Sequence, residues 1–400
     1  MSMPTVGVVS LKANYNAAGD GSTDDTQAIK SFLDYLASNG GTGLIEPGVY
    51  VSNSYSRDGN AKPFNIIGSG PELTILKNKS TNTFFTWRNC NGIHIKGLKL
   101  DCQYTTLKPT GNNRKHGFVL SSCQNCSVED SIAYDFVGTG FLSLKQSTTS
   151  SECLNITFLN CTAQATEAFL DWKSATTAEE KNKKLCNGVI LVDCNDSKII
   201  NCTAIDMSLF GIELKNNAKW NKVIHCKAVR CVYGFGMGQQ TQGDIGCEYN
   251  IVDDFQSRDC YIGGILGKAK YNILSNFLVD FSDMVKTDIR NAFRFQLNSR
   301  FNSLNNILIS GLPEEKVAIL YETAANNNVS VISFIEKNET DNNIIVAQYS
   351  NTSSASKDTI GNYTFLYRSN ASSDKLKVAG DSVTNNESKY AWNNSNIPIF

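Results

Sequence analysis

The chain has 400 residues, a formal net charge of -1 and only 19% charged residues. This near-neutral charge excludes the basic surface with which nucleic-acid-binding proteins contact phosphate groups. No apolar stretch reaches the length of a membrane span, and residues 1–10 lack the basic and apolar segments of a signal peptide. We therefore expect no nucleic-acid partner, no membrane insertion and no secretory signal.

The first fifty residues have the features of a capping segment. The stretch 23–38 predicts an amphipathic helix, with Thr23 as its N-cap and Gly40 just beyond its end. Such a helix can cover the open end of a stacked core, because its apolar residues fall on one side: Ile29, Phe32, Leu33 and Leu36. We predict an N-terminal cap over residues 1–50, made of this helix and a first strand.

A loose repeat follows, from about residue 90 to residue 350. Each unit begins with Asn, alternates apolar and polar residues, and reaches Cys or an apolar residue five positions on, as in Asn221–Cys226, Asn250–Phe255, Asn272–Phe277 and Asn302–Ile307. The uneven spacing of these units favours solenoid coils over propeller blades. We predict an all-β fold: a single-stranded right-handed parallel β-helix of about ten coils over residues 51–350. Residues 351–400 would form a C-terminal cap or oligomerisation tail.

A second strand-like segment follows the first in most coils. The segments that carry charge are 140–145, 168–173, 211–215 and 292–296. Period-two alternation places one set of side chains in the core and the other set outside. The Asn at a fixed position of each coil indicates a ladder of stacked amides, which is a structural role.

The thirteen cysteines are odd in number and scattered, and no second CxxC pair accompanies Cys123 and Cys126 to complete a metal site. We therefore expect buried free thiols and no metal. Glycosylation sequons at Asn155, Asn160 and Asn201 lie in predicted strands, where a glycan would disrupt the sheet. Both features favour folding in a reducing compartment such as a bacterial cytoplasm.

The stretches Gly19–Ile29 (GDGSTDDTQAI) and Gly40–Tyr50 (GGTGLIEPGVY) resemble the opening of the pectate-lyase-like superfamily, in the form typical of bacteriophage tailspikes and capsule depolymerases. The resemblance covers about fifty residues and is specific for the fold. It implies a right-handed β-helix, a homotrimer, a place in the phage virion, and binding and cleavage of bacterial capsule or O-antigen. It says little about chemistry, because the superfamily includes hydrolases, lyases, epimerases and non-catalytic binders.

Glycoside hydrolysis generally needs two carboxyl groups, about 5 Å apart for retention or about 6.5–9.5 Å apart for inversion. Strands stacked at about 4.8 Å bring outward carboxylates of nearby coils into that range. Asp171 and Glu213 are the predicted acid and base or nucleophile, with glycines at 236 and 238 leaving room for a sugar. Asp193 is the alternative to Asp171. The predicted substrate-binding residues are Lys145, Lys173, Lys215, Trp220 and Arg294.

Other interpretations remain open. The charged column is also compatible with an ordinary exposed ion ladder, and the whole chain with a non-catalytic polysaccharide-binding adhesin. A lyase on the same face would use Lys173 or Lys215 as base and calcium as cofactor, whereas a hydrolase needs no cofactor. A second column of turn residues ranks lower, because acidic turn residues usually cap backbone amides: Asp135, Glu167, Asp206, Arg230 and Asp259. The preferred hypothesis is an endo-acting glycoside hydrolase.

Overall fold

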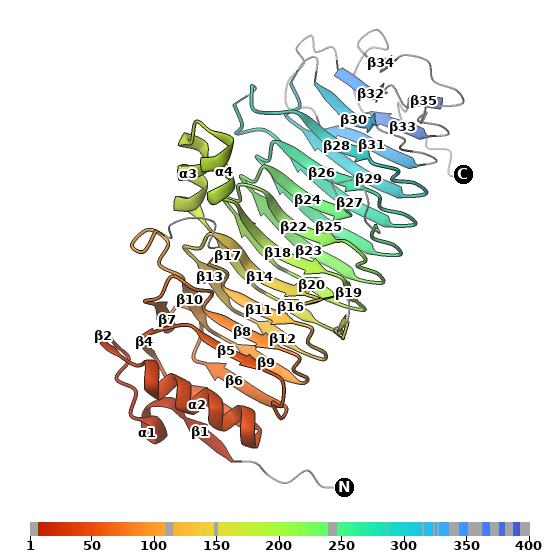
Figure 1. Ribbon diagram of the computed structural model, residues 1–400. Coiled ribbons are helices and arrows are strands. Elements are labelled where there is room, and N and C mark those ends of the chain that lie inside the picture. Colours follow the sequence, from red (N-terminus) through yellow and green to blue (C-terminus); the bar gives the residue numbers. More distant parts are fainter. Residues whose placement is uncertain are drawn as a thin grey trace, which may run out of the picture. The chain divides into compact units, whose positions relative to one another are not determined.

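The computed structural model describes residues 7–108, 115–147, 151–238, 246–285, 287–313, 316–322, 325, 328–335, 344–350, 362–368, 376–380 and 387–392 (Figure 1). The chain divides into two compact units, Met1–Leu209 and Phe210–Phe400. The strands within each unit stack in parallel, as the predicted β-helix requires.

The first unit begins with a helical cap. Strand β1 (Val8–Ser10) leads into α1 (Leu11–Tyr15), and β2 (Asp20–Asp24) leads into α2 (Thr26–Asn39). Helix α2 buries the predicted apolar side, from Ile29 to Leu36. The predicted helix start at Thr23 is wrong. Asp20 accepts hydrogen bonds from the backbone of Ser22 and Thr23, and these residues form the edge strand β2 instead of a first helical turn.

Three parallel ladders continue the first unit. The first consists of β3 (Gly41–Ile45), β6 (Phe64–Gly68), β9 (Ile93–Lys96), β12 (Ser127–Glu129), β16 (Thr157–Leu159) and β20 (Lys198–Ile200). The second consists of β2, β4 (Gly48–Ser52), β7 (Thr74–Asn78), β10 (Lys99–Asp101), β13 (Ile132–Tyr134), β17 (Thr162–Gln164) and β21 (Thr203–Ile205).

The third ladder of this unit carries the last strand of each coil, which is the second strand-like segment predicted from the sequence. It consists of β5 (Tyr55–Asp58), β8 (Phe85–Arg88), β11 (Phe118–Ser121), β14 (Gly138–Leu144) and β18 (Cys186–Val192). The short strands β15 (Cys153–Leu154) and β19 (Cys194–Asn195) pair at a turn. Helices α3 (Thr166–Ser174) and α4 (Ala178–Lys183) interrupt the coil between β17 and β18.

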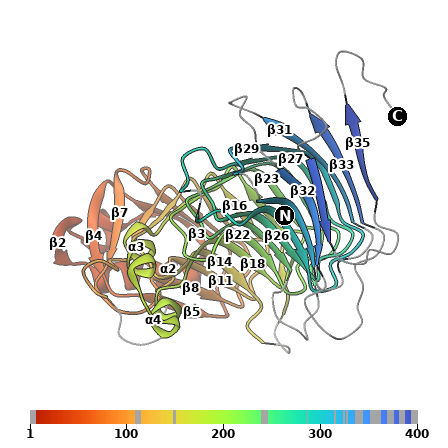
Figure 2. The ribbon, with the colours of Figure 1, turned by 90° about the horizontal axis from the view of Figure 1, so that it is seen from above.

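The second unit has two parallel ladders (Figure 2). One consists of β22 (Phe210–Lys215), β24 (Tyr233–Gly238), β26 (Ile262–Gly267), β28 (Asn291–Gln296), β30 (Val317–Glu322), β32 (Ile344–Ser350) and β34 (Leu376–Gly380). The other consists of β23 (Lys222–Val229), β25 (Ile251–Arg258), β27 (Ile273–Asp280), β29 (Ser303–Ser310), β31 (Val329–Ile335), β33 (Tyr363–Arg368) and β35 (Glu387–Trp392).

The pairings of the last strands concern the predicted boundary at residue 350. Strands β33, β34 and β35 follow residue 350 and continue the parallel ladders without a change of pairing. A cap or oligomerisation role for residues 351–400 stays a prediction, as does the boundary at residue 50.

Both cores are filled by residues that stack at equivalent coil positions. Phe118 lies on Phe141 with 5.1 Å between ring centroids, and Phe255 lies on Phe277 at 4.7 Å. All thirteen cysteines are free and buried. Their thiols donate to nearby backbone carbonyls, as Cys202 does to Ile200 at 3.4 Å. The predicted role of the cysteines as small buried apolar residues is confirmed.

The predicted amide ladder runs through the second unit. Its rungs are Asn221, Asn250, Asn272, Asn302, Asn328 and Asn362, all at most 1% exposed. From Asn221 to Asn328, each Nδ2 donates to Oδ1 of the next rung at 2.9–3.0 Å. Each backbone N–H donates to the same oxygen at 2.9–3.2 Å. The ladder therefore satisfies buried polar groups that no water reaches.

Replacing one rung should destabilise the second unit strongly. Asn272→Ala removes the acceptor of the buried backbone N–H of Asn250. It also removes one of the two hydrogen bonds of Asn250 Nδ2 and one of the two at Oδ1 of Asn302. At about 1–3 kcal/mol for the unsatisfied N–H and about 0.5–1.5 kcal/mol for each of the two other lost hydrogen bonds, we expect a loss of at least roughly 2 kcal/mol in the free energy of unfolding. Urea unfolding measures it, with the exposed Asn305→Ala as control, which should change stability by less than about 0.5 kcal/mol. Equal effects of the two variants would contradict a ladder role.

Candidate functional site

Strand β22 places Glu213 on the face opposite its core residues. Ile212 and Leu214 are fully buried in the core, and alternation turns Glu213 outward, as predicted. Glu213 is nevertheless only 2% exposed. The space predicted above Gly236 is filled, since a Cβ there would meet the ring of Phe210 at 2.5 Å and Cγ of Glu213 at 3.3 Å. Glu213 therefore lies in an enclosed site beside an aromatic ring.

This enclosure sets the protonation of Glu213. Burial raises the pKa of Glu213 to about 7, against the opposing influence of Lys215. The ammonium group of Lys215 lies 3.9 Å from Oε1, and Oε2 has no hydrogen-bond partner among the described residues. A carboxyl group that keeps its proton near neutral pH can act as a general acid.

Arg294 lies on the same ladder but farther along it. In the strand register, Glu213 pairs with Gly236, Gly236 with Ile265, and Ile265 with Arg294. Three steps between strands correspond to about 14 Å. Lys215 thus lies beside Glu213, whereas Arg294 lies three strands away along the ladder.

The prediction that residues 168–173 form an outward-facing strand is wrong. These residues lie in helix α3 (Figure 1). Phe169 and Trp172 stack at 6.0 Å, the i,i+3 neighbourhood of a helix, and Lys173 lies 5.7 Å from the ring centre of Phe169. The apolar spacing that suggested a strand serves this local packing instead.

Asp171 has an ionic environment of its own in the first unit. Its carboxylate accepts hydrogen bonds from the hydroxyl of Tyr104 at 2.8 Å and from Lys108 at 2.7 Å. Burial alone would raise the pKa of Asp171, but these two hydrogen bonds outweigh it, so the pKa lies below its usual value. Asp171 therefore remains ionised near neutral pH. The predicted pairing of Asp171 with Glu213, which belongs to the second unit, stays a prediction.

The other residues predicted in the first unit flank strand ends. Lys145 follows β14, and its backbone N–H donates to Val192 at 3.2 Å. Asp193 follows β18 in a left-handed turn with φ of 52°. In the turn column, Asp135 accepts from Thr105 and Asp206 from Thr166, as expected of turn-capping residues.

Sequence reasoning missed Lys115. It is fully buried, and its Nζ has no hydrogen-bond partner within the described ranges. Burial lowers the pKa of Lys115, against the influence of Cys102 and Asp135. Only the stacking of coils brings these three residues together, so no local motif could have identified them.

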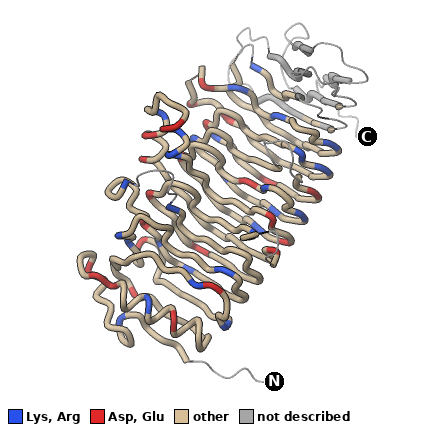
Figure 3. The backbone as a smooth tube through the Cα atoms, in the orientation of Figure 1, with Lys and Arg blue, Asp and Glu red and all other residues tan. Residues whose placement is uncertain are grey.

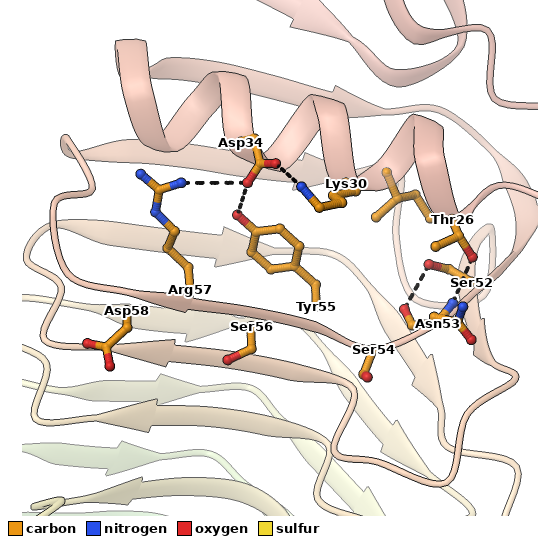
Figure 4. A pocket seen from close by; sticks show the side chains of 11 residues that line it. Thr26, Lys30, Asp34, Ser52, Asn53, Ser54, Tyr55, Ser56, Arg57 and Asp58 are labelled. Atoms are coloured by element: carbon orange, nitrogen blue, oxygen red, sulfur yellow. Dashed lines mark hydrogen bonds and ion pairs between the residues drawn. The ribbon is translucent and has the colours of Figure 1, made fainter.

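A cavity of about 310 Å³ lies between α2 and β5 (Figure 4). Its wall includes Asp34, which accepts from Tyr55 at 3.0 Å and from Lys30 at 2.6 Å, with Arg57 at 3.6 Å. These contacts tie the cap helix to β5. None of the predicted site residues lines this cavity.

The described part of the chain lacks both a cluster of metal-ligating side chains and a membrane-spanning helix. No three His, Cys, Asp or Glu side chains there are grouped closely enough to hold a metal ion. No helix there combines the length and the apolar character needed to cross a membrane.

Lys115→Met should stabilise the protein. A buried ammonium without a partner costs free energy that a methionine of similar length avoids. Because the folded-state pKa is lowered, this cost is complete below that pKa and disappears as pH rises towards about 10.4, where the unfolded lysine also loses its proton. We expect a thermal midpoint above wild type at pH 7 and a smaller difference at pH 10. The exposed Lys96→Met is the control, and a lower midpoint for Lys115→Met would overturn this interpretation.

Glu213 should make stability fall with rising pH. The pKa of Glu213 is raised in the folded state. The free energy of unfolding of the wild type is therefore highest below about pH 4.3, where Glu213 is protonated in both states, and falls as pH rises through about 7. Glu213→Gln removes this dependence and should be more stable than wild type above pH 8, by roughly 3 kcal/mol relative to pH 4. Urea unfolding across this range measures the difference, with exposed Glu72→Gln as control. Parallel curves for wild type and Glu213→Gln would show that Glu213 titrates normally.

The comparisons with known proteins concern the fold. No family model matches the chain. It is 25% identical over 329 residues to the tail spike protein of Escherichia virus K5, a match covering 79% of this chain and 47% of the relative. The chain thus spans about half the length of the curated relative it matches.

Two solved structures have a fold similar to that of this chain. The mannuronan C-5 epimerase AlgE6 A-module of Azotobacter vinelandii aligns with a TM-score of 0.71 and 12% identity over 97% of this chain and 100% of the other. The Dettilon tailspike protein aligns with a TM-score of 0.56 and 14% identity over 81% and 66%. The resemblance predicted from the sequence is confirmed at the level of the fold: the chain is a right-handed parallel β-helix, similar to those of these proteins.

Proposed function

We propose that this chain is the polysaccharide-cleaving β-helix of a phage tailspike, acting on bacterial capsule or O-antigen by glycoside hydrolysis. One observation carries the proposal: Glu213 is an outward-facing carboxyl group whose burial raises its pKa to about 7. A structural glutamate on a strand face would be solvated or fully paired. Glu213 is neither, since Lys215 lies 3.9 Å from Oε1 and Oε2 has no hydrogen-bond partner among the described residues.

Glu213 is the proposed general acid. Its proton passes to the glycosidic oxygen as the bond to the anomeric carbon breaks. The second carboxyl group must be ionised, to activate water or to attack as nucleophile. Asp171, whose pKa is lowered by Lys108 and Tyr104, stays the candidate that the sequence predicts for this second group. Asp193 is retained as the alternative second carboxylate.

Access to Glu213 requires a movement of side chains. Phe210 lies over Gly236 and stacks on Tyr233 with 4.7 Å between ring centroids. A sugar entering the site would replace these rings above Glu213. Such closure over a protonated acid keeps water away before substrate binds.

The basic residues indicate an acidic polysaccharide. Lys215 and Arg294 lie on one ladder of the second unit, and Lys145 and Lys173 contribute positive charge in the first. The tailspike relative supports a place in the phage virion, and a homotrimer is the assembly that the sequence resemblance implies. Hydrolysis by two carboxyl groups needs no cofactor.

The competing function is binding without cleavage. The 3% exposure of the Glu213 side chain favours it. A lyase would instead use Lys215, 3.9 Å from Glu213, as base, with calcium to neutralise a uronate.

Glu213→Gln should reduce cleavage of a bound polysaccharide by at least about 100-fold, because general acid catalysis contributes about 10²–10⁴. The wild-type rate should fall as pH rises above about 7, where Glu213 loses its proton. Reducing-end assays on a panel of capsule and O-antigen polysaccharides measure both effects, with Glu72→Gln as the folded control.

The products separate the alternatives. New reducing ends without near-ultraviolet absorbance indicate hydrolysis, and products with this absorbance indicate elimination. Binding without any product favours an adhesin. Wild-type activity of Glu213→Gln refutes the assignment of the acid.

A further inference from the structure

Four turns of the second unit expose one column of aromatic residues, here named the aromatic stripe: Trp220, Tyr249, Tyr271 and Phe301. Their ring centroids are 6.2, 5.4 and 5.2 Å apart, with interplanar angles of 8°, 7° and 2°. The residues are 53%, 47%, 45% and 44% exposed, in chain order. The stripe is thus a continuous aromatic surface whose rings stack on one another.

The backbone does not favour aromatic residues at these positions. All four lie in the left-handed region, with φ between 56° and 58°. Bulky side chains are rare in this region, which Gly, Asn and Asp adopt more readily.

The first unit provides an internal comparison. Its corresponding turns are joined from coil to coil by the bridges Asn91–Gln124–Leu154 and by the pair β15–β19. The residues that come directly after these bridged residues are Gly92, Asn125, Asn155 and Asp196. These four have φ of 74°, 52°, 54° and 50°. The same turn is therefore built there with the residues that it favours. In the second unit, strained and exposed aromatic residues replace them, which indicates a contact surface.

A charged row accompanies the stripe. The residue before each aromatic side chain bridges to the next turn, in the order Lys219, Glu248, Lys270 and Arg300. Glu248 lies 3.0 Å from Lys219 and 3.7 Å from Lys270. Three basic residues against one acidic residue leave a positive excess in this row. Figure 3 marks basic and acidic residues along the described chain in blue and red. An acidic ligand therefore matches the row.

The dimensions favour a narrow, extended ligand. Four half-exposed aromatic side chains present roughly 400 Å². A stable contact between two copies of the chain needs about 800 Å² on each partner and excludes charge from its centre. The stripe has half that area and a charged border. A polymer lying along the stripe needs no wide interface.

We propose that the aromatic stripe binds an acidic polysaccharide that lies along it. Because the ring faces contact one another, the polymer meets ring edges, the hydroxyl groups of Tyr249 and Tyr271, and the cations of Lys270 and Arg300. The apolar edges pack against sugar C–H groups, while the polar groups bind hydroxyls and carboxylates. The choice of a polysaccharide rests on the proposed function, but this binding does not require Glu213.

The test replaces the aromatic residues with the residue that the turn prefers. The double variant Tyr249→Asn and Tyr271→Asn keeps a left-handed backbone accessible, so it should fold with a thermal midpoint near that of wild type. Its affinity for acidic polysaccharide should fall at least about tenfold, since exposed aromatic anchors often contribute over 1 kcal/mol each. Leu73→Asn, at an exposed turn of the first unit, is the matched control.

Binding is measured by isothermal titration calorimetry with purified acidic capsular polysaccharides and with dextran as the neutral probe. A further measurement in the Glu213→Gln background separates binding from cleavage. The proposal predicts that the loss persists in this background and that salt weakens wild-type binding. It also predicts unchanged cleavage of short oligosaccharides, with a raised KM only for long chains.

Other outcomes overturn the proposal. Unchanged affinity in the double variant rules out the stripe, even if Glu213 proves catalytic. Equal binding of dextran rules out acidic selectivity, and a change of oligomeric state in the double variant assigns the stripe to contacts between copies. Failure of every acidic polysaccharide to bind wild type also refutes it. Conversely, a stripe-dependent affinity without cleavage supports the stripe and refutes only the hydrolase.

Discussion

The fold depends on one constraint, the hydrogen-bonded distance of about 4.8 Å between successive parallel strands. It forces each side chain to lie above an equivalent side chain of the next coil. A residue type that pairs well with itself is therefore repeated, as the amides of Asn250 and Asn272 are. A residue that differs in type from the residues stacked above and below it does not find matching hydrogen-bond partners among them. Glu213, with Gly236 as its register partner, is such a residue.

Burial, more than charge, distinguishes the candidate acid from the surrounding ionic residues. Glu179 and Lys183 form a solvated pair on α4, of the kind that contributes little to stability. Glu213 lies 3.9 Å from its nearest cation and is shielded by an aromatic ring. The same enclosure that raises its pKa limits access of a ligand. The proposed catalysis by Glu213 would therefore require Phe210 to move.

The sequence was sufficient to predict what the repeat determines. The coils, the amide ladder and the buried thiols all follow from side chains at regular spacing, as does the outward direction of Glu213. Helix α3 was missed because its apolar residues fit a strand over six positions, and only the interruption of the ladder distinguishes the two. The filling of the space above Gly236 was missed because the ring of Phe210 comes from another strand. Lys115 becomes exceptional only once its burial is known.

The amide ladder gives the second unit a direction. Every rung from Asn221 to Asn328 donates its Nδ2 hydrogen to the rung that follows it in the sequence. The side-chain dipoles consequently point the same way and polarise one another, as in any chain of hydrogen bonds in a medium of low dielectric constant. The parallel strands repeat along the unit without distinguishing one end from the other. The row of amide dipoles does distinguish them, because all its dipoles have the same orientation. It makes the two ends of the unit electrically distinct without any net charge.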